Sequence, residues 1–364
     1  MKKTKIAFYN RHAPHYRKAI YQLLDAELNV DFYFGDSRPG NIKKLDYSLL
    51  KNFKKEFKNY SFKNFYIQKG LLEFINKDYD VYLTPGDFYN LYNWILLPVL
   101  RLKSKKIIFW THGIYGKESK VELLLKKLFY SLATDIMLYG NYNKELMIKN
   151  GFESKKLHTI YNSLDYDYQL KLRNQLLNLP KKENDIFNIV FIGRLTKVKK
   201  LDFLLNSFIT LHNNNIDCKL TLIGSGEEEH KLKKIVSKHK LNHKVDFIGA
   251  LYDEEDIANY LFNADLCVSP GNVGLTAMHA MMYGTPVISH NRFEMQMPEV
   301  EAIIKGETGD FYDYNNQESL THVIQQYIIN VKDREVVRNK CFERIDNYYN
   351  PYNQVKIIKK ITQI

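Results

Sequence analysis

The chain has 364 residues, a formal net charge of +12 and a hydrophobic fraction of 45% that includes 27 Tyr and 21 Phe. Its length favours about two domains, and its composition excludes a largely disordered chain. The longest apolar run, residues 94–100, is far shorter than the ~20 residues that span a bilayer. Any membrane contact is therefore expected to be peripheral.

The cysteines and the N-terminal segment favour a cytoplasmic protein. The three cysteines are far apart, so they form neither a disulfide framework nor a metal-ligand spacing. The first lysines lead directly into a strand pattern without the apolar region of a signal peptide. We therefore expect a cytoplasmic protein that could lie on the inner face of the cell membrane.

Apolar runs alternate with amphipathic stretches along the first half, which is typical of a parallel sheet covered by helices. The predicted strands are KIAFY, VDFYF, DVYLT, KIIFW, DIMLY and LHTIY, and the predicted helices cover 14–28, 89–101, 120–132 and 142–149. Residues 166–186 are polar and contain Pro180. This stretch is predicted to be a linker, or a short helix followed by a linker.

The same alternation returns in the second half, with strands at FNIVFI, KLTLIG, VDFIG, DLCVSP and PVISH. We therefore expect an α/β fold of two Rossmann-like, doubly wound parallel-sheet domains. The expected parts are domain 1–165, linker 166–186, domain 187–345 and a C-terminal helix in 346–364 that packs back on the first domain. Ligands of open α/β sheets bind beyond the carboxyl ends of the strands, so a cleft between the domains is the expected site.

The positive charge suits nucleic acid, anionic lipid or a phosphorylated ligand. Residues 47–65 interleave lysines with aromatic side chains. That mixture fits an anionic membrane surface, and it equally fits a solvated basic face over core aromatics. We recognise no nucleic-acid-binding module and expect no nucleic-acid partner.

Two strand-to-helix turns carry features of a phosphate site. In the first, Gly193 permits a tight turn, and Arg194 and Lys199 could clamp a diphosphate from two sides. In the second, residues 270–276 open a helix whose free N–H groups and dipole suit an anion. Each turn alone is also compatible with an ordinary connection, because the glycine spacing matches neither common nucleotide fingerprint.

Taken together, the segments FIGRLTKVKKLDFLLNSF, LIGSGEEEHKL, VDFIGALYDEEDIANYLFNADLCVSP and GLTAMHAMMYGTPVIS, with MPEVEAIIKGETGDFY, carry more information. In order and spacing they resemble the C-terminal half of the retaining GT-B glycosyltransferases of family 4, over roughly residues 187–312. The first half matches more loosely through PHYRKAIYQLL, WTHG and IYNSLD. The resemblance implies a GT-B architecture, with two Rossmann-like domains facing across a cleft, and sugar transfer from a nucleotide diphosphate without a metal or another cofactor.

The resemblance also implies a donor site. Arg194 and Lys199 match the family's basic pair on the pyrophosphate, and His112 matches a histidine that contacts the transferred sugar. The remaining positions implied on the donor side form the phosphate cradle, the base pocket and the loops beside them: Gly193, Gly224, Gly249, Ala250, Leu251, Asn272, Gly274, Leu275, Thr276, His279 and Glu299.

The chain departs from the family at two positions, where Gly271 and His279 stand in place of two glutamates. Three explanations are open: a ribose contact by neutral His279, a carboxylate supplied by Glu294, Glu299 or Glu301, or lost activity. We favour the first two in combination, because the residues that match the pyrophosphate site remain.

Two acidic clusters are not expected to bind a metal. Asp165–Asp167 imitates a D-x-D motif but leads into the expected linker, and residues 227–230 place carboxylates at a helix start, where the dipole favours them.

We therefore expect a retaining, metal-independent, hexosyltransferase-like enzyme. Its expected partners are a nucleotide-sugar donor and a lipid-linked or other saccharide acceptor in capsule or lipopolysaccharide assembly. The alternatives are a nucleotide-sugar epimerase of the same fold and a catalytically silent nucleotide-sugar-binding protein.

Overall fold

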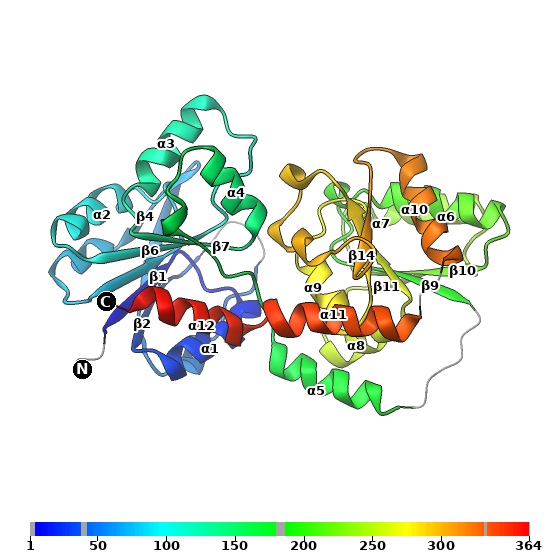
Figure 1. The fold of residues 1–364 in the computed structure, drawn as a ribbon, viewed down its shortest axis with the longest axis horizontal. Helices are drawn as coiled ribbons and strands as arrows, with labels where there is room; N and C mark the ends of the chain where they lie inside the picture. The colour runs from blue at the N-terminus through cyan, green and yellow to red at the C-terminus, as the bar shows by residue number, and fades with distance from the viewer. Residues whose placement is uncertain (1–3, 38–41, 180–185, 331–332, 364) are drawn as a thin grey trace. The chain divides into compact units, whose positions relative to one another are not determined.

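The computed structural model describes residues 4–37, 42–179, 186–330 and 333–363, which fold into two compact units (Figure 1). Unit 1 comprises Met1–Asp165 and Asn350–Ile364, and unit 2 comprises Tyr166–Tyr349. Each unit is built around one sheet whose strands are mostly parallel. The predicted α/β class with two parallel-sheet domains is confirmed.

The sheet of unit 1 has eight strands in the order β4-β3-β2-β1-β5-β6-β7-β8. Its central strands are continuous apolar runs, as expected for strands buried on both faces. In chain order the strands are β1 (Ile6–Asn10), β2 (Val30–Gly35), β3 (Phe53–Phe62), β4 (Phe65–Lys69), β5 (Val81–Thr84), β6 (Lys106–Thr111), β7 (Asp135–Leu138) and β8 (Leu157–Thr159).

Two apolar cores, one on each face, hold the helices of unit 1 to this sheet. These helices are α1 (Lys18–Glu27), α2 (Asn93–Leu102), α3 (Lys120–Tyr130), α4 (Asn141–Lys149) and α12 (Pro351–Thr362). The last helix of the chain packs against α1 through Val355, Ile358 and Ile361, which are buried in one of the cores.

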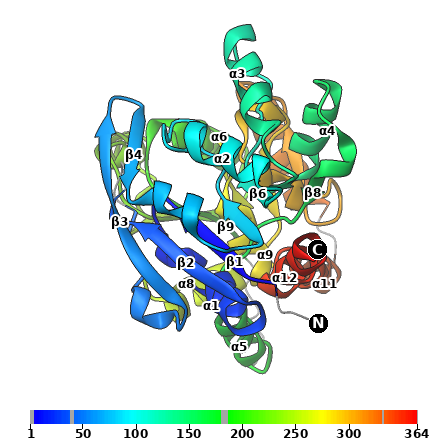
Figure 2. The same ribbon diagram turned by 90° about the vertical axis from the view of Figure 1, so that its left-hand side faces the viewer.

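The basic and aromatic stretch forms a β-hairpin at the edge of this sheet (Figure 2). Strand β3 pairs in parallel with β2, and β4 returns antiparallel to β3. We did not predict either strand. The reason is that Phe57 is the one fully buried residue of β3, so no continuous apolar run marks it.

The sheet of unit 2 has six parallel strands in the order β11-β10-β9-β12-β13-β14. They are β9 (Phe187–Ile192), β10 (Cys218–Ile223), β11 (Val245–Gly249), β12 (Leu266–Val268), β13 (Val287–His290) and β14 (Gly309–Tyr312). The helices that accompany them are α6 (Leu201–Asn213), α7 (Glu229–Lys238), α8 (Glu254–Asn263), α9 (Leu275–Met282), α10 (Gln317–Ile329) and α11 (Arg334–Tyr348).

Of the two structures predicted for residues 166–186, a linker or a short helix followed by a linker, the helix is present: residues 166–177 form α5 (Tyr166–Leu177), which packs on α8 in unit 2. Its buried side chains include Gln169 and Arg173, and Arg173 donates two hydrogen bonds to Asp346, at 3.0 and 2.8 Å. Because two of the four buried side chains of α5 are polar, the sequence of this helix does not show a clear apolar face. Pro180, on which the linker prediction depended, lies outside the described residues.

No helix in the described ranges is both long enough and apolar enough to cross a membrane.

Candidate functional site

The strand order of unit 2 reverses at β9, because β10 and β11 lie on one side of it and β12 to β14 lie on the other. A reversal of this kind is the usual ligand-binding point of an open α/β sheet, at the carboxyl ends of the strands. The predicted donor-side turns follow the strands at this point: Gly193 follows β9 and Gly224 follows β10.

Glycines allow these turns to approach one another closely. The Gly193 N–H donates to the Ile223 carbonyl at 2.9 Å, and the Gly224 N–H donates to the Gly249 carbonyl at 2.7 Å. A Cβ on Gly224 would lie 1.9 Å from the Gly193 carbonyl oxygen, so no larger residue fits there. The turns after β9, β10 and β11 therefore form one continuous surface of backbone. Ala250 and Leu251, predicted to contact a base, directly follow this surface.

The loop between β12 and α9 is held by side chains from within unit 2. Four of its carbonyl oxygens accept hydrogen bonds from side chains: Ser269 and Gly271 from the Ser289 hydroxyl (2.9 and 3.2 Å), Pro270 from the Tyr312 hydroxyl (2.6 Å) and Asn272 from Lys199 Nζ (2.5 Å). The N–H of Val273 donates to Gln296 Oε1 at 2.8 Å. The loop is thus held by side chains of unit 2, and Lys199 is one of them.

Helix α9 begins without a side-chain cap. Its N-cap is Gly274, with φ +54, and among the described residues no side chain caps this end of the helix. Uncapped N–H groups at the positive end of the helix dipole form an anion-binding position. The Thr276 hydroxyl donates to the Ile192 carbonyl at 2.9 Å. This hydrogen bond connects the start of α9 to the end of β9. The hydroxyl proton of Thr276 is thus already used, so the predicted donation from Thr276 to a ligand would compete with this bond.

Lys199 lies at this helix start, because its Nζ donates to the Asn272 carbonyl in the loop before α9. Burial and then the nearby charge of Arg194 lower the pKa of Lys199 to about 8. The influence of Arg194 on this pKa means that the two side chains are electrostatic neighbours. Arg194 is exposed, and its guanidinium forms no hydrogen bond or ion pair within the described part of the chain. Lys199 thus lies beside the N-terminus of α9, and Arg194 is an electrostatic neighbour of Lys199 in the same unit.

Gly271 stands where the family resemblance leads one to expect a glutamate. A Cβ at this position would lie 2.0 Å from the carbonyl oxygen of Val198 and 2.7 Å from Lys199 Cα. The Gly271 N–H also donates to the Lys199 carbonyl at 3.0 Å. The backbone that carries Lys199 therefore occupies the space of a side chain at 271, and no glutamate fits there without a shift of that backbone.

His279 has a carboxylate partner that we did not predict. Its Nε2 lies 2.8 Å from Oε1 of Glu254, the first residue of α8. The same oxygen accepts from the Tyr283 hydroxyl at 2.6 Å and from Gln169 Nε2 at 2.9 Å. Burial opposes ionisation of Glu254, but the hydrogen bonds, first that of His279, outweigh it and hold the pKa of this carboxyl below its usual value.

The carboxylates that we proposed as substitutes, Glu294, Glu299 and Glu301, also belong to unit 2. Their contact with a ribose stays a prediction. Glu294 pairs with exposed Arg292 at 2.7 Å, whereas Glu299 is buried and its charge acts on Lys199. Sequence reasoning missed Glu254 because it stands among several acidic residues in the first turn of α8. Acidic residues are common at helix N-termini, where they cap the helix and interact favourably with its dipole, so they did not indicate a binding site.

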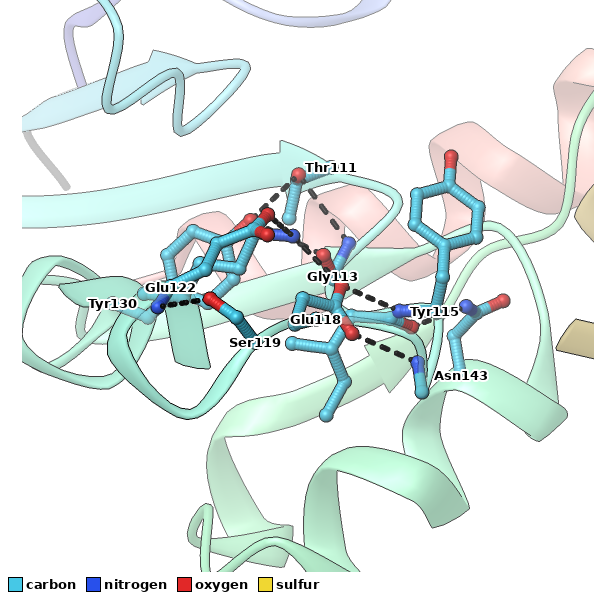
Figure 3. Close-up of polar contacts among 11 residues, drawn as sticks. Thr111, Gly113, Tyr115, Glu118, Ser119, Glu122, Tyr130 and Asn143 are labelled. Atoms are coloured by element: carbon cyan, nitrogen blue, oxygen red, sulfur yellow. Dashed lines mark hydrogen bonds and ion pairs between the residues drawn. The ribbon is translucent and has the colours of Figure 1, made fainter. Parts of the chain in front are cut away.

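His112, the remaining predicted catalytic residue, belongs to unit 1 and directly follows β6. Its ring packs against that of Tyr139, with the centroids 4.6 Å apart. The loop after it is held by Glu118, whose carboxylate accepts from the N–H groups of Tyr115 (2.8 Å) and Gly116 (2.9 Å), as Figure 3 shows in part.

Glu118 is itself held by a buried ion pair. Lys126 Nζ lies 2.7 Å from Glu118 Oε1 and 3.2 Å from Glu122 Oε1, and both Lys126 and Glu118 are almost fully buried. From the other side, Asn143 donates to the Ile114 carbonyl at 2.8 Å. The His112 loop is therefore attached to both α3 and α4. The contact of His112 with a sugar stays a prediction.

Comparison with known proteins gives the fold its class. The Anabaena protein HepE in complex with UDP is 14% identical and covers 99% of this chain and 100% of its own, with a TM-score of 0.71. The apo form of the lipopolysaccharide outer core galactosyltransferase WaaB is 15% identical. The match covers 98% of this chain and 99% of WaaB, also with a TM-score of 0.71. The fold is the GT-B fold.

The family model of the glycosyl transferases group 1 matches residues 174–344. An uncharacterized glycosyltransferase of Methanocaldococcus jannaschii is 24% identical over 303 residues, which are 78% of this chain and 75% of that protein. Unit 2 therefore contains a glycosyl transferases group 1 domain, and Lys199, Arg194 and the start of α9 lie within it.

Proposed function

We propose that this protein is a glycosyltransferase that binds a nucleotide-diphosphate sugar in unit 2 and transfers the sugar, with retained configuration, to an acceptor. The observation that carries the proposal is the position of Lys199 beside the uncapped N-terminus of α9, with Arg194 as its electrostatic neighbour. The matched family model and the UDP bound to one structural neighbour support a nucleotide-sugar donor.

The proposed chemistry uses the cations as stabilisers of the leaving group. Negative charge develops on the diphosphate when the glycosidic bond breaks, and donors that are already in place there lower the barrier. Arg194 and Lys199 supply two positive charges, and the N–H groups of α9 supply uncharged donors. We propose that this set acts without a metal ion, and that His112 orients the sugar.

The ribose is proposed to meet the pair formed by His279 and Glu254. A hydrogen bond of 2.8 Å joins His279 Nε2 to Glu254, and the carboxylate remains ionised around neutral pH because its pKa is lowered. Nε2–H of a neutral His279 donates to the ionised carboxylate, so Nδ1 of His279 and Oε2 of Glu254 remain as acceptors for the hydroxyl groups of a ribose. In this proposal Glu254 supplies the carboxylate that Gly271 and His279 do not.

The acceptor is proposed to be a lipid-linked saccharide at the inner face of the cell membrane, in the assembly of a surface polysaccharide. The name of the WaaB neighbour, a lipopolysaccharide outer core galactosyltransferase, supports this class of acceptor. The excess of positive charge supports an anionic membrane nearby.

Two assays test the proposal. Nucleotide sugars are first screened by thermal shift, because a ligand that binds only the folded protein raises its melting temperature. The selected donor is then incubated with saccharide acceptors, with EDTA in a parallel sample, and the anomeric configuration of the product is read by NMR. Arg194→Ala should lower the rate by about a hundredfold or more, as expected for one donor to a developing negative charge, whereas the exposed neighbour Lys197→Ala should not.

Two other results would contradict the proposal. An isomerised sugar nucleotide formed from donor alone would indicate an epimerase. Binding of a donor with neither transfer nor hydrolysis, over a broad acceptor panel, would indicate a silent binding protein.

A further inference from the structure

Helix α3 carries an apolar face that no other part of the described chain covers. Val121, Leu124, Leu125 and Leu128 have exposed fractions of 69%, 67%, 43% and 59%. Their spacing is i, i+3, i+4 and i+7, which places them on one stripe of the helix. The opposite stripe carries Lys126, Phe129 and Tyr130, which are buried in unit 1.

This arrangement is unusual for the surface of a monomer. Single exposed leucines are common, but a continuous stripe of aliphatic side chains marks a surface that binds a partner or a membrane. Figure 1 shows α3 at the upper end of unit 1, where its outer side is not covered by another element.

Lysines border the apolar stripe. Lys117, Lys120 and Lys127 are exposed, and at 100° per residue Lys120 and Lys127 lie on the same flank of the stripe. The acidic residues of this segment, Glu118 and Glu122, are both engaged by Lys126. The exposed surface of α3 is therefore apolar along its centre and positively charged along its edge.

We propose that α3 lies in the headgroup region of an anionic lipid leaflet, with the stripe of Val121, Leu124, Leu125 and Leu128 among the upper acyl chains. Long lysine side chains at the edge of such a helix reach the headgroups while their aliphatic stems stay with the apolar layer. A second copy of this chain is a poorer occupant, because a symmetric contact would bring the same lysines together.

The β3–β4 hairpin of the same unit supports a lipid surface independently. Tyr60, Phe62 and Phe65 have exposed fractions of 46%, 73% and 44%. Lys58 Nζ lies 5.6 Å from the ring centre of Tyr60, and Lys63 Nζ lies 5.8 Å from that of Phe62. Of the two interpretations of residues 47–65, the hairpin end fits the membrane, whereas Phe57 belongs to the core.

The inference deepens the proposed function, because it rests on that proposal for the lipid-linked acceptor. The leaflet that α3 contacts would be the one that carries this acceptor. The α3 helix also holds the His112 loop through Lys126 and Glu118, so lipid contact and that loop share one structural element.

Flotation of the full-length protein with vesicles tests the inference. The vesicles are phosphatidylcholine alone or with 30% phosphatidylglycerol. The change is the double substitution Leu124→Ser with Leu128→Ser, and the matched control in unit 2 is Ile329→Ser with Val336→Ser, at side chains of similar exposure (61% and 54%). Melting temperature and sedimentation are measured for each protein.

We expect the wild type and the control to float with the anionic vesicles, less so as salt is added. The double change in α3 should weaken this binding by roughly a hundredfold, about tenfold for each leucine removed from an apolar layer. Wild-type binding to neutral vesicles should be weaker, because the lysines then lack counter-charges.

The inference is overturned if the wild type does not float, or if the α3 variant binds as well as the control. It is also overturned if the wild type sediments as a dimer that the α3 variant dissociates, since the stripe would then bind a second copy. Nucleotide-sugar binding, read by thermal shift, is independent of these results. Its failure with intact flotation would reject the proposed function and leave the surface in place.

Discussion

Donor binding should weaken as the pH rises above neutrality, because Lys199 loses its proton. Burial and the charge of Arg194 lower the pKa of Lys199 to about 8 in the free protein. A diphosphate beside the ammonium favours the charged form and raises that pKa in the complex. The free protein must therefore take up a proton to bind donor at high pH, and this proton uptake reduces the affinity.

The size of the effect follows from the lowered pKa. Below pH 7 Lys199 is almost fully protonated and the affinity should be constant. At pH 9 about one molecule in ten carries the proton, so the dissociation constant should be roughly tenfold higher than at pH 7. The change corresponds to about 1.4 kcal/mol of binding free energy.

Calorimetric titration with the nucleotide sugar selected by screening, from pH 6 to pH 9, measures this profile. Lys199→Met should bind more weakly at pH 7 by about 1.5 to 3 kcal/mol, the usual contribution of a hydrogen bond to a charged group, and should lack the decline above pH 7. The control Lys197→Met, at an exposed position of the same turn, should keep the decline. If Lys199→Met and the wild type show the same profile, Lys199 does not contact the diphosphate.

Three substitutions give further predictions. Gly271→Glu, which introduces the residue typical of the family, should lower the melting temperature by several degrees and not raise activity, because its Cβ would lie 2.0 Å from a backbone oxygen. His279→Glu places a second carboxylate beside Glu254, so the pKa of one of the two carboxyls should rise. The variant is then more stable below that raised pKa, where this carboxyl is protonated, and loses stability as the pH rises through it. Its melting temperature should therefore fall further below that of the wild type at pH 8 than at pH 5. Glu118→Ala removes one partner of a buried ion pair and should cost about 3 kcal/mol of unfolding free energy in chemical denaturation, more than Glu122→Ala at the more exposed second partner of Lys126. Equal melting temperatures for Gly271→Glu and wild type, a pH-independent deficit for His279→Glu, or an unchanged denaturation midpoint for Glu118→Ala would each contradict the corresponding contact.

The sequence predicted the fold class because most strands are short apolar runs buried on both faces. It failed where tertiary contacts bury polar residues or expose apolar ones. Arg173 and Gln169 obscure the apolar face of α5 and left the choice between a linker and a short helix open, because their burial depends on Asp346 and Glu254, which are distant in the chain. Strand β3 was missed for the opposite reason, since most of its side chains face solvent.

The candidate site was predictable in its backbone and less so in its side chains. Glycine turns after apolar strands indicate where the chain approaches a ligand, and they led to Gly193 and Gly274, whereas Gly224 came from the family resemblance. The close contact between Gly271 and the Val198 carbonyl could not be predicted, because it depends on how the turn that carries Lys199 packs on the next loop. His279 and Glu254 are 25 residues apart in the sequence and belong to different helices, so no local sequence pattern predicts their pairing.

The most direct test of the account is a crystal structure of the protein with its selected nucleotide sugar. The account predicts that the oxygens of the diphosphate lie within hydrogen-bond distance of the Arg194 guanidinium, Lys199 Nζ and the backbone N–H of Leu275. A diphosphate bound away from the start of α9, with Arg194 and Lys199 not in contact with it, would contradict the central claim.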